Sequence, residues 1–463
     1  MGAVPIDPLP SMPVLLFALA VSMGTGIAFG MAPAWLATRV DPIEALRGAN
    51  RSTDRVGSFP RQALVVAQAA LSLVLLSASG LLTFALHRMQ GQDFGFEQDR
   101  RTIVNFDARL AGYGPQQLMP LFQRIQDAIT NIPGVSDVAL CLYSPLSGNN
   151  WGTGVWVDGH PPPGPNDDAF VSMDRVMPGY FKAIATAIIA GRGITEHDTQ
   201  TSQHVAVINQ ALARKFFRNE NPIGQFFGRP ELNVGSREFQ IVGVAKDARY
   251  QAADVERHVG PLLFLAEAQH QRNGEGKEPD PGSHYMRDIV VVTRPGAHIS
   301  DAQLRAAMAS VDPNLPIIVI RSLHEQVTAV FRQRRLIASM TSMFGVLSLV
   351  LASIGLYGVT AYNAGRRANE IGVRMALGAD AHDAVALVLR GAFRLIVIGL
   401  GIGLPLAFAA GRVLGHALYG IDPYNPWTTL IAVAALGISA LCASLIPALR
   451  ASMISPMDAL RVE

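Results

Sequence analysis

The stretch AGRRANEIGVRMALGA, residues 364–379, lies between two long apolar runs of the chain. Glu370 and Arg374 are spaced i,i+4 and can pair on one face of a helix, while Ile371 and Met375 fall on the neighbouring strip. The pattern predicts a short amphipathic helix held between two membrane spans, where it offers a firm surface to a soluble partner. The other interpretation is an ordinary polar loop, because a short motif alone is weak evidence.

The composition favours a membrane protein. Of the 463 residues, 49% are hydrophobic and 16% are charged, and the mean hydropathy is +0.26. Soluble domains are more charged and less apolar than this. The net charge of +2 gives no strong field for binding nucleic acid. The two cysteines, Cys141 and Cys442, fall in a soluble stretch and an apolar run, so no disulfide between them is expected.

Five apolar runs reach the length of about 20 residues that a helix needs to cross a hydrocarbon core of about 30 Å. They are Pro13–Leu36, Gln62–Leu86, Ile337–Tyr362, Gly391–Gly411 and Pro426–Ile446. Small residues such as Gly399, Gly401 and Gly403 recur in these runs and favour close helix packing. Arg390 and Arg394 stand at one edge, where they can snorkel, so no charged ion path is expected.

The arginines predict the orientation of the spans. They cluster after the first run, after the third run and in the C-terminal tail, at Arg39, Arg47, Arg51, Arg55, Arg61, Arg366, Arg367, Arg374, Arg390, Arg450 and Arg461. Because positive loops stay on the cytoplasmic side, all three segments are expected there. The start of the chain, residues 87–335 and the loop 412–425 then lie outside.

An internal repeat links the two ends of the chain. The Pro-Ala start and the Ala-Leu-Arg end of residues 33–47 recur in residues 447–461 at a constant offset of 414. Such repeats in transporters mark duplicated membrane units, and the alternative is chance similarity. We therefore expect residues 1–50 to be the last span and cytoplasmic tail of a first unit. Residues 51–86 are expected to be a linker and the first span of a complete unit, so that the chain is the C-terminal part of a duplicated protein.

Residues 87–335 are expected to form a large soluble domain between spans two and three. Two βαβ halves, 101–145 and 287–333, are predicted to flank an inserted subdomain, 146–285. The predicted elements are strands Thr102–Asp107, Ser136–Tyr143, Asp288–Thr293 and Pro316–Arg321, and helices Pro115–Asn131 and Asp301–Val311. Pro133 and Pro313 follow the two helices and force the chain out of helical geometry.

Several motifs of this chain resemble, in order, the MacB/FtsX-type permeases of ABC transporters. In the soluble domain they are MPGYFKAI (177–184), IAGR (189–192), VAVINQALARKFF (205–217), NPIG (221–224) and FQIVGVAKDARY (239–250), and RRANEIGVRMALGA follows near the C-terminus. The resemblance covers nearly the whole chain. Together with the five apolar runs, it predicts an α-helical transmembrane bundle of five spans with a large α+β periplasmic domain inserted between spans two and three. It also implies a three-span FtsX-like permease domain, 336–463, with a cytoplasmic coupling segment, 363–380.

The resemblance further implies that the coupling segment touches an ATPase subunit. The residues that match the motif and carry this expectation are Arg366, Arg367, Glu370, Ile371, Gly372, Arg374, Met375, Ala376, Leu377 and Gly378. Gly378 is also typical of a helix stop.

The motifs of common enzymes are missing from the sequence. It contains no Gly-x-x-x-x-Gly-Lys-[Ser/Thr] loop to cradle ATP and no Gly-x-Ser-x-Gly, and His324-Glu325 lacks the second histidine of a zinc protease. Glu196-His197-Asp198 is the densest titratable cluster, and a solvated loop is favoured over a metal site. We therefore expect no catalytic, cofactor or metal residues here, and ATP bound by a partner subunit.

The leading hypothesis is a permease subunit in the bacterial inner membrane, coupled to a separate ABC ATPase and moving its periplasmic domain during export of an unknown substrate. It would act as a homodimer or as a pseudo-dimer with a second permease unit, with a periplasmic partner possible and no nucleic acid. Two alternatives stay open, a non-transporting regulator of an envelope enzyme and a membrane-anchored receptor.

Overall fold

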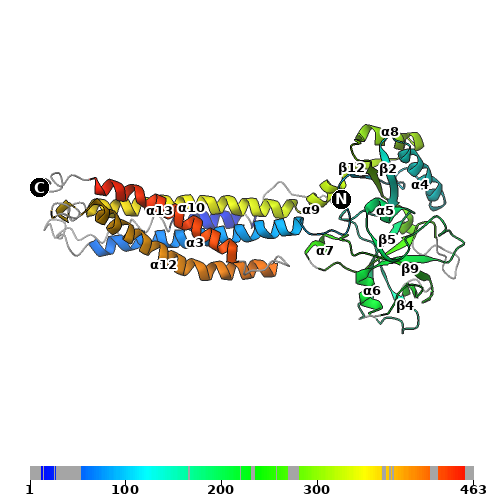
Figure 1. Ribbon diagram of the computed structural model, residues 1–463, viewed down its shortest axis with the longest axis horizontal. Coiled ribbons are helices and arrows are strands. Elements are labelled where there is room, and N and C mark those ends of the chain that lie inside the picture. The colour runs from blue at the N-terminus through cyan, green and yellow to red at the C-terminus, as the bar shows by residue number, and fades with distance from the viewer. Residues whose placement is uncertain are drawn as a thin grey trace. The chain divides into compact units, whose positions relative to one another are not determined.

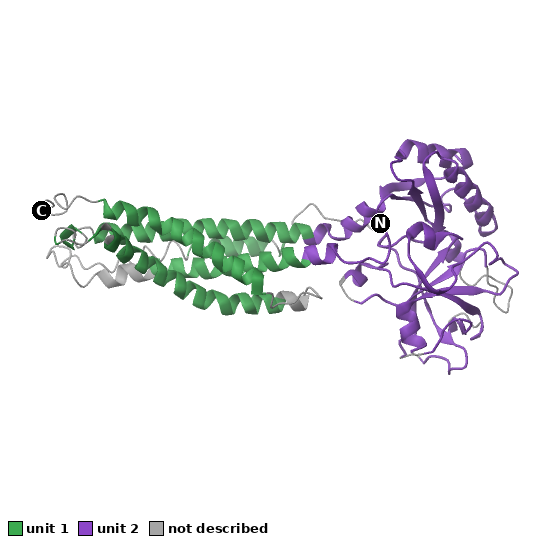
Figure 2. Ribbon diagram, in the orientation of Figure 1, with its two compact units in different colours: residues 1–85, 335–463 green, residues 86–334 purple. Residues whose placement is uncertain are grey.

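The structure, a computed structural model, describes most of the chain from residue 54 onwards (Figure 1). The described residues are 12–13, 15–24, 27 and 54–453, without 165–166, 219, 231–234, 257, 270–280, 368–371, 375–376, 378–379 and 418–425. The chain forms two compact units (Figure 2). The helical unit comprises residues 1–85 and 335–463, and the second unit comprises residues 86–334.

Among the described residues, the helical unit contains four long apolar helices: α3 (Asp54–Gln90), α10 (Arg332–Arg366), α12 (Ala381–Ala417) and α13 (Pro426–Ser452). Their stretches with spanning length and composition are Arg61–Gln90, Arg332–Arg366, Val385–Val413 and Pro426–Ser452. At about 1.5 Å per residue, even the shortest exceeds a hydrocarbon core of about 30 Å. Four of the five predicted spans are thus present as helices.

The fifth predicted span, Pro13–Leu36, lies largely outside the described residues. Its described part is an apolar helix of ten residues, Leu15–Gly24. A total of five spans therefore stays a prediction, as does the orphan unit proposed for residues 1–50.

Glycines on one face of α12 allow it to approach α3 closely. A β-carbon added at Gly403 would lie 3.0 Å from the Cα atom of Ala70, and one at Gly399 would lie 2.8 Å from the Cβ atom of Ala69. Gly401 has open space around it. Close packing through small residues was predicted from the sequence and is confirmed at Gly399 and Gly403, which are four residues apart and therefore share a face.

Replacing Gly403 by leucine is expected to destabilise the helical unit by about 1–3 kcal/mol, because the new side chain has to push α12 away from α3. Gly401→Leu is the matched control, since its side chain enters open space. Thermal unfolding of the full chain in detergent measures both. Equal melting temperatures for the two variants would contradict the close approach of α12 and α3.

Serine hydroxyls join α10 to its neighbours within the apolar bundle. Ser72 and Ser79 of α3 contact Ser348 and Ser342 of α10, with oxygen–oxygen distances of 2.7 Å and 2.5 Å. Hydroxyl pairs of this kind hold helices together in lipid, where water cannot compete for them. The two contacts lie about two helical turns apart, so α3 and α10 are tied along their length.

The second unit contains a split βαβ fold. Strands β1 (Arg101–Phe106), β2 (Val135–Cys141), β11 (Asp288–Thr293) and β12 (Ile317–Ser322) form the order β12-β1-β11-β2, with all neighbours antiparallel. Helices α4 (Pro115–Thr130) and α8 (Asp301–Val311) bury Leu118, Phe122 and Leu304 in one core with these strands. The six elements lie where the sequence predicted them. β11 enters between β1 and β2, so each βαβ half completes the sheet of the other.

The sheet continues into the inserted part of the unit, between β2 and β11 in the chain. Its strands are β3 (Gly152–Gly154), β4 (Trp156–Val157), β5 (Phe170–Val176), β6 (Ile188–Gly191), β7 (Val205–Asn209), β8 (Phe226–Gly228), β9 (Phe239–Ala245) and β10 (Leu262–Ala266). The order runs β2-β5-β10-β7-β9-β8-β4, with β3 on β5 and β6 on β9. The short helices are α5 (Tyr180–Ile184), α6 (Gln210–Phe216), α7 (Ala252–Glu256), η2 (Pro281–His284) and α9 (Leu323–Val330). β2 and β5 meet at Cys141, opposite Val176.

The two chain ends of the second unit pack into its largest core. Leu86 from the end of α3, Leu323 and Val327 from α9, and Phe331 just before α10 share this core with the tyrosines at the β2–β5 junction. Phe331 is 1% exposed and its ring meets that of Phe94 edge to face. The residues adjoining the membrane helices are thus built into the folded unit.

Candidate functional site

The arginine-rich end of the helical unit, defined by Arg61, Arg366, Arg367, Arg374 and Arg450, gathers side chains from α3, α10 and α13 and from the chain between α10 and α12. Arg61 and Arg366 both lie over Tyr362, with guanidinium carbons 4.8 Å and 5.7 Å from its ring centroid. Arg450 Nη1 donates a hydrogen bond of 3.2 Å to the hydroxyl of Tyr357. Cation–π contacts and this hydrogen bond fix the ends of three helices to one another.

A small apolar core supports this end. Ala364 of α10, Val388 of α12 and Ala448 and Ala451 of α13 are buried together. Alanines let the three helices approach closely at this end.

The coupling segment predicted from the sequence lies here. Arg366 and Arg367 end α10 and are exposed, and Gly372–Arg374 form a helical turn in which Gly372 is buried. The N–H of Leu377 donates to the carbonyls of Val373 and Arg374 at 3.0 Å and 3.1 Å. Glu370, Ile371, Met375, Ala376 and Gly378 fall outside the described residues, and the predicted Glu370–Arg374 ion pair stays a prediction.

The turn presents apolar side chains to its surroundings. Leu377 is 84% exposed and Val373 is 44% exposed, beside the exposed guanidinium of Arg374. Exposed apolar side chains close in the sequence to an arginine can mark a surface that binds another protein. The sequence identified Leu377 through the family motif alone; its exposure was not predicted.

Tyr357 and Tyr362 were not singled out from the sequence. The signal that could have found them is positional, because tyrosines near the end of an apolar run, followed by arginines, are typical of a membrane interface. Arg61 and Arg450 were predicted only as orientation signals, whereas the structure shows them in contact with these rings.

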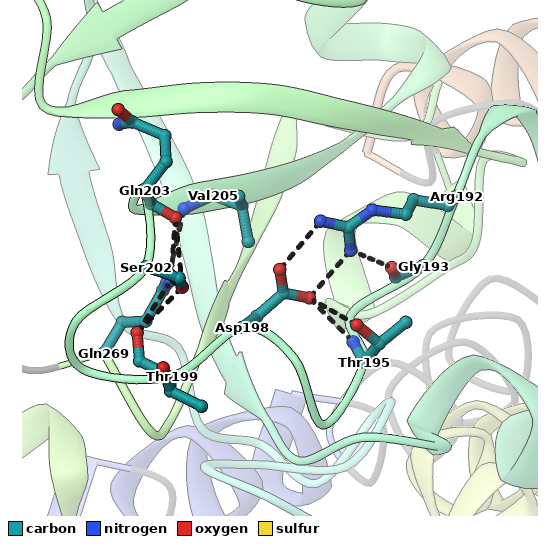
Figure 3. Close-up of polar contacts among 9 residues, drawn as sticks. All are labelled: Arg192, Gly193, Thr195, Asp198, Thr199, Ser202, Gln203, Val205 and Gln269. Atoms are coloured by element: carbon teal, nitrogen blue, oxygen red, sulfur yellow. Dashed lines mark hydrogen bonds and ion pairs between the residues drawn. The ribbon is translucent and has the colours of Figure 1, made fainter.

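A second polar cluster lies in the loop between β6 and β7 (Figure 3). Arg192 Nη1 and Nη2 donate to the two carboxylate oxygens of Asp198, each at 2.7 Å, and the N–H of Thr195 donates to the same carboxylate at 2.8 Å. Burial alone would raise the pKa of Asp198, but these hydrogen bonds outweigh it and hold the pKa below its usual value. The predicted solvated loop is therefore wrong for Asp198, which is 4% exposed, although Glu196 and His197 are exposed.

Gln269 holds the following part of the same loop (Figure 3). Its side-chain oxygen accepts from the N–H of Val205 at 2.9 Å, and its Nε2 donates to Ser202 Oγ at 3.0 Å and to the carbonyl of Gln203 at 2.9 Å. These hydrogen bonds fix the loop against β7.

A buried carboxylate lies beside the β2–β5 junction. Asp174 of β5 is fully buried; its Oδ1 accepts a long hydrogen bond of 3.4 Å from the N–H of Tyr143, while Oδ2 finds no partner among the described residues. Burial raises the pKa of Asp174 well above its usual value, and the nearby Asp288 carboxylate raises it further.

Asp174→Asn is expected to leave the stability of the full chain unchanged or higher at pH 7. Because the folded-state pKa is raised, the wild type loses stability as pH rises above the unfolded carboxyl pKa of about 3.9, and the amide removes this loss. Asp198→Asn is the control of opposite sign, since it breaks the Arg192 contact and should lower stability. Melting curves between pH 5 and 8 measure both, and a strongly destabilised Asp174→Asn would contradict a neutral Asp174.

Comparisons with known proteins agree with the order of these parts along the chain. Residues 63–309 match the family described as the MacB-like periplasmic core domain, and residues 342–456 match the FtsX-like permease C-terminal domain. The first match covers more than half of the chain.

Curated relatives share this arrangement at low identity. The macrolide export ATP-binding/permease protein MacB of Bdellovibrio bacteriovorus is 24% identical over 311 residues, which cover 62% of this chain and 43% of that relative. The pyoverdine export ATP-binding/permease protein PvdT of Pseudomonas putida is 25% identical over 288 residues, which cover 59% of this chain and 40% of that relative. The chain thus spans less than half the length of these relatives.

Among solved structures, the periplasmic region of MacB from Actinobacillus actinomycetemcomitans is similar to 53% of this chain over 98% of its own length, with 14% identity and a TM-score of 0.34. The two family matches and the four apolar helices together describe a membrane protein with a periplasmic domain. The chain belongs to the MacB-like family of ABC transporter permeases, with a MacB-like periplasmic core domain and an FtsX-like permease domain.

Proposed function

We propose that this chain is a permease subunit of the bacterial inner membrane that receives force from a separate ATPase at the arginine-rich end and passes it to residues 86–334. The observation that carries the proposal is the pair of helices α3 and α10. The apolar part of α3 begins at the arginine-rich end, and α10 ends there. Leu86, near the end of α3, and Phe331, directly before α10, are both buried in the core of the second unit.

The chain path through α3 and α10 supports the transmission of movement as the mode of action, and not the conduction of a solute. The serine contacts tie α3 to α10, and Phe331 is buried in the core of the second unit. The movement would rearrange the periplasmic unit, and we infer export of a substrate as the outcome. The complete transporter would contain two such permease units, as a homodimer or with a second permease chain.

The test is co-purification of the full chain with an ABC ATPase encoded in the same genome. Reversing the predicted pair with Glu370→Arg and Arg374→Glu should release the ATPase. A matched control reverses the exposed i,i+4 residues Asp301 and Arg305 of α8, which should leave binding intact. Binding that survives the first reversal would contradict the coupling role.

Transport and regulation are separated in a second step. Efflux of candidate compounds from cells is measured with an active ATPase and with one that cannot hydrolyse ATP. Efflux that depends on hydrolysis supports export, whereas an intact complex without any efflux supports the regulatory alternative. A chain that binds no ATPase would be a receptor.

A further inference from the structure

We infer that the arginine-rich end of the helical unit contains a binding site for the head group of an anionic phospholipid, in a cavity between α3 and α10. Binding of a lipid at this site would not require an ATPase. The cavity has a volume of about 250 Å³ and is lined by Arg61 and Gln62 of α3 and by Gly358, Val359, Tyr362 and Asn363 of α10. Its volume corresponds to about eight water molecules, which suits a phosphodiester with a short polyol.

The lining residues supply the chemistry of an anion site. Arg61 stacks on Tyr362, and stacking occupies the face of a guanidinium while its N–H groups at the edge still donate. Gln62 and Asn363 add amide donors, and Arg366 lies over the same ring at 5.7 Å. Among the six described residues that line the cavity there is no carboxylate to repel a phosphate.

The position of the cavity points to a lipid and not to a free anion. The apolar run of α10 ends at Tyr362, and the apolar stretch of α3 begins at Arg61, so the cavity lies at the level where head groups are found. One turn further into the apolar part, Leu64 of α3 and Ile354 of α10 are 42% and 62% exposed. A phosphate held by Arg61 would therefore have lipid-facing apolar side chains next to it for the acyl chains. Basic pockets between spanning helices on the cytoplasmic side are known to suit anionic head groups.

The test titrates the full chain in neutral detergent with fluorescent phosphatidylglycerol, and with phosphatidylcholine of the same acyl chains. The wild type should bind phosphatidylglycerol saturably and at least about tenfold more tightly than phosphatidylcholine. Loss of one basic side chain should weaken binding about fivefold, and the double variant Arg61→Gln with Arg366→Gln should weaken it about thirtyfold. Arg61→Lys keeps the charge but not the stacked plane and should fall between these values.

Arg390→Gln is the matched control, because Arg390 is an exposed arginine near the start of α12 and does not line the cavity. Its affinity for phosphatidylglycerol should equal that of the wild type. Equal affinity of the wild type for the two lipids would overturn the inference, and this result needs no variant to fold. Undiminished binding by the double variant would also overturn it. Competition by inorganic phosphate at the same concentration as phosphatidylglycerol would reassign the cavity to a free anion.

Discussion

Leu377→Asp is expected to abolish co-purification of the permease with its ATPase. Leu377 is 84% exposed, so its side chain can insert into a pocket of a partner. Burying a leucine side chain in a partner contributes about 1.5–3 kcal/mol, and a buried aspartate would cost more than the lost contact. The dissociation constant should therefore rise by at least about thirtyfold.

Leu110→Asp is the matched control for this change. Leu110 is a leucine of the second unit and is 71% exposed, so the same substitution alters charge and apolar surface equally at a site outside the coupling segment. Surface plasmon resonance with the ATPase immobilised measures both variants against the wild type. Equal affinities of the Leu377 and Leu110 variants would exclude Leu377 from the interface.

Arg229→Ala is expected to destabilise the β8–β9 region by about 3–5 kcal/mol, because it leaves a buried carboxylate without its partner. Arg229 Nη2 lies 2.5 Å from Glu238 Oε1, and the two side chains are 1% and 2% exposed. The pair joins residues that directly follow β8 and precede β9, where Phe227 and Phe239 stack at 5.4 Å. Amide hydrogen exchange of these strands in the full chain measures the free energy of opening.

A double replacement separates the charge from the packing. Arg229→Met with Glu238→Leu removes both charges and should recover most of the loss. Burial raises the pKa of Glu238 above its usual value although Arg229 opposes this, and without Arg229 the pKa should rise further. The Arg229→Ala variant should therefore lose stability as pH rises from about 4.3 through the new folded pKa. A double variant as unstable as the single one would contradict the argument.

Local patterns in the sequence predicted the elements of the second unit because each depends on neighbours in the chain. The strand at 288–293 and the helix at 301–311 were predicted at the bounds that the structure shows. The entry of β11 between β1 and β2 could not be predicted, since a pairing between residues almost 190 positions apart leaves no local signal. The burial of Asp198 could not be predicted either, because it depends on the contact with Arg192 and on how the loop folds around the carboxylate.

At the arginine-rich end, the motif could be predicted from the sequence, whereas the contacts around it could not. Leu377 stood among ten motif residues of equal weight, and the structure adds that its apolar side chain is 84% exposed. Tyr362 could not be recognised as the ring that two arginines share, because Arg61 reaches it from a helix about 300 residues earlier. Contacts between spanning helices depend on how the helices are rotated, and periodicity alone does not determine that rotation.

A further buried carboxylate, that of Asp107, is expected to make the stability of the second unit depend on pH. Burial would raise the pKa of Asp107, but the guanidinium groups of Arg109 and Arg287 lower it to about 2. Asp107 is 4% exposed, so its contacts should contribute about 2 kcal/mol to the free energy of unfolding above pH 4. This contribution should be lost as the pH falls towards 2. Acid unfolding of Asp107→Asn beside the wild type measures this, and identical curves below pH 4 would contradict it.

The most direct test of the account asks on which face of the membrane each end lies. Glu196→Cys in the second unit and Arg367→Cys at the arginine-rich end are both exposed positions, and Cys442→Ala removes the exposed native thiol while Cys141 is buried. A membrane-impermeant maleimide added to spheroplasts should label the Glu196 variant and reach the Arg367 variant only after lysis. Labelling of both variants from the same side would contradict the transmission of force across the membrane.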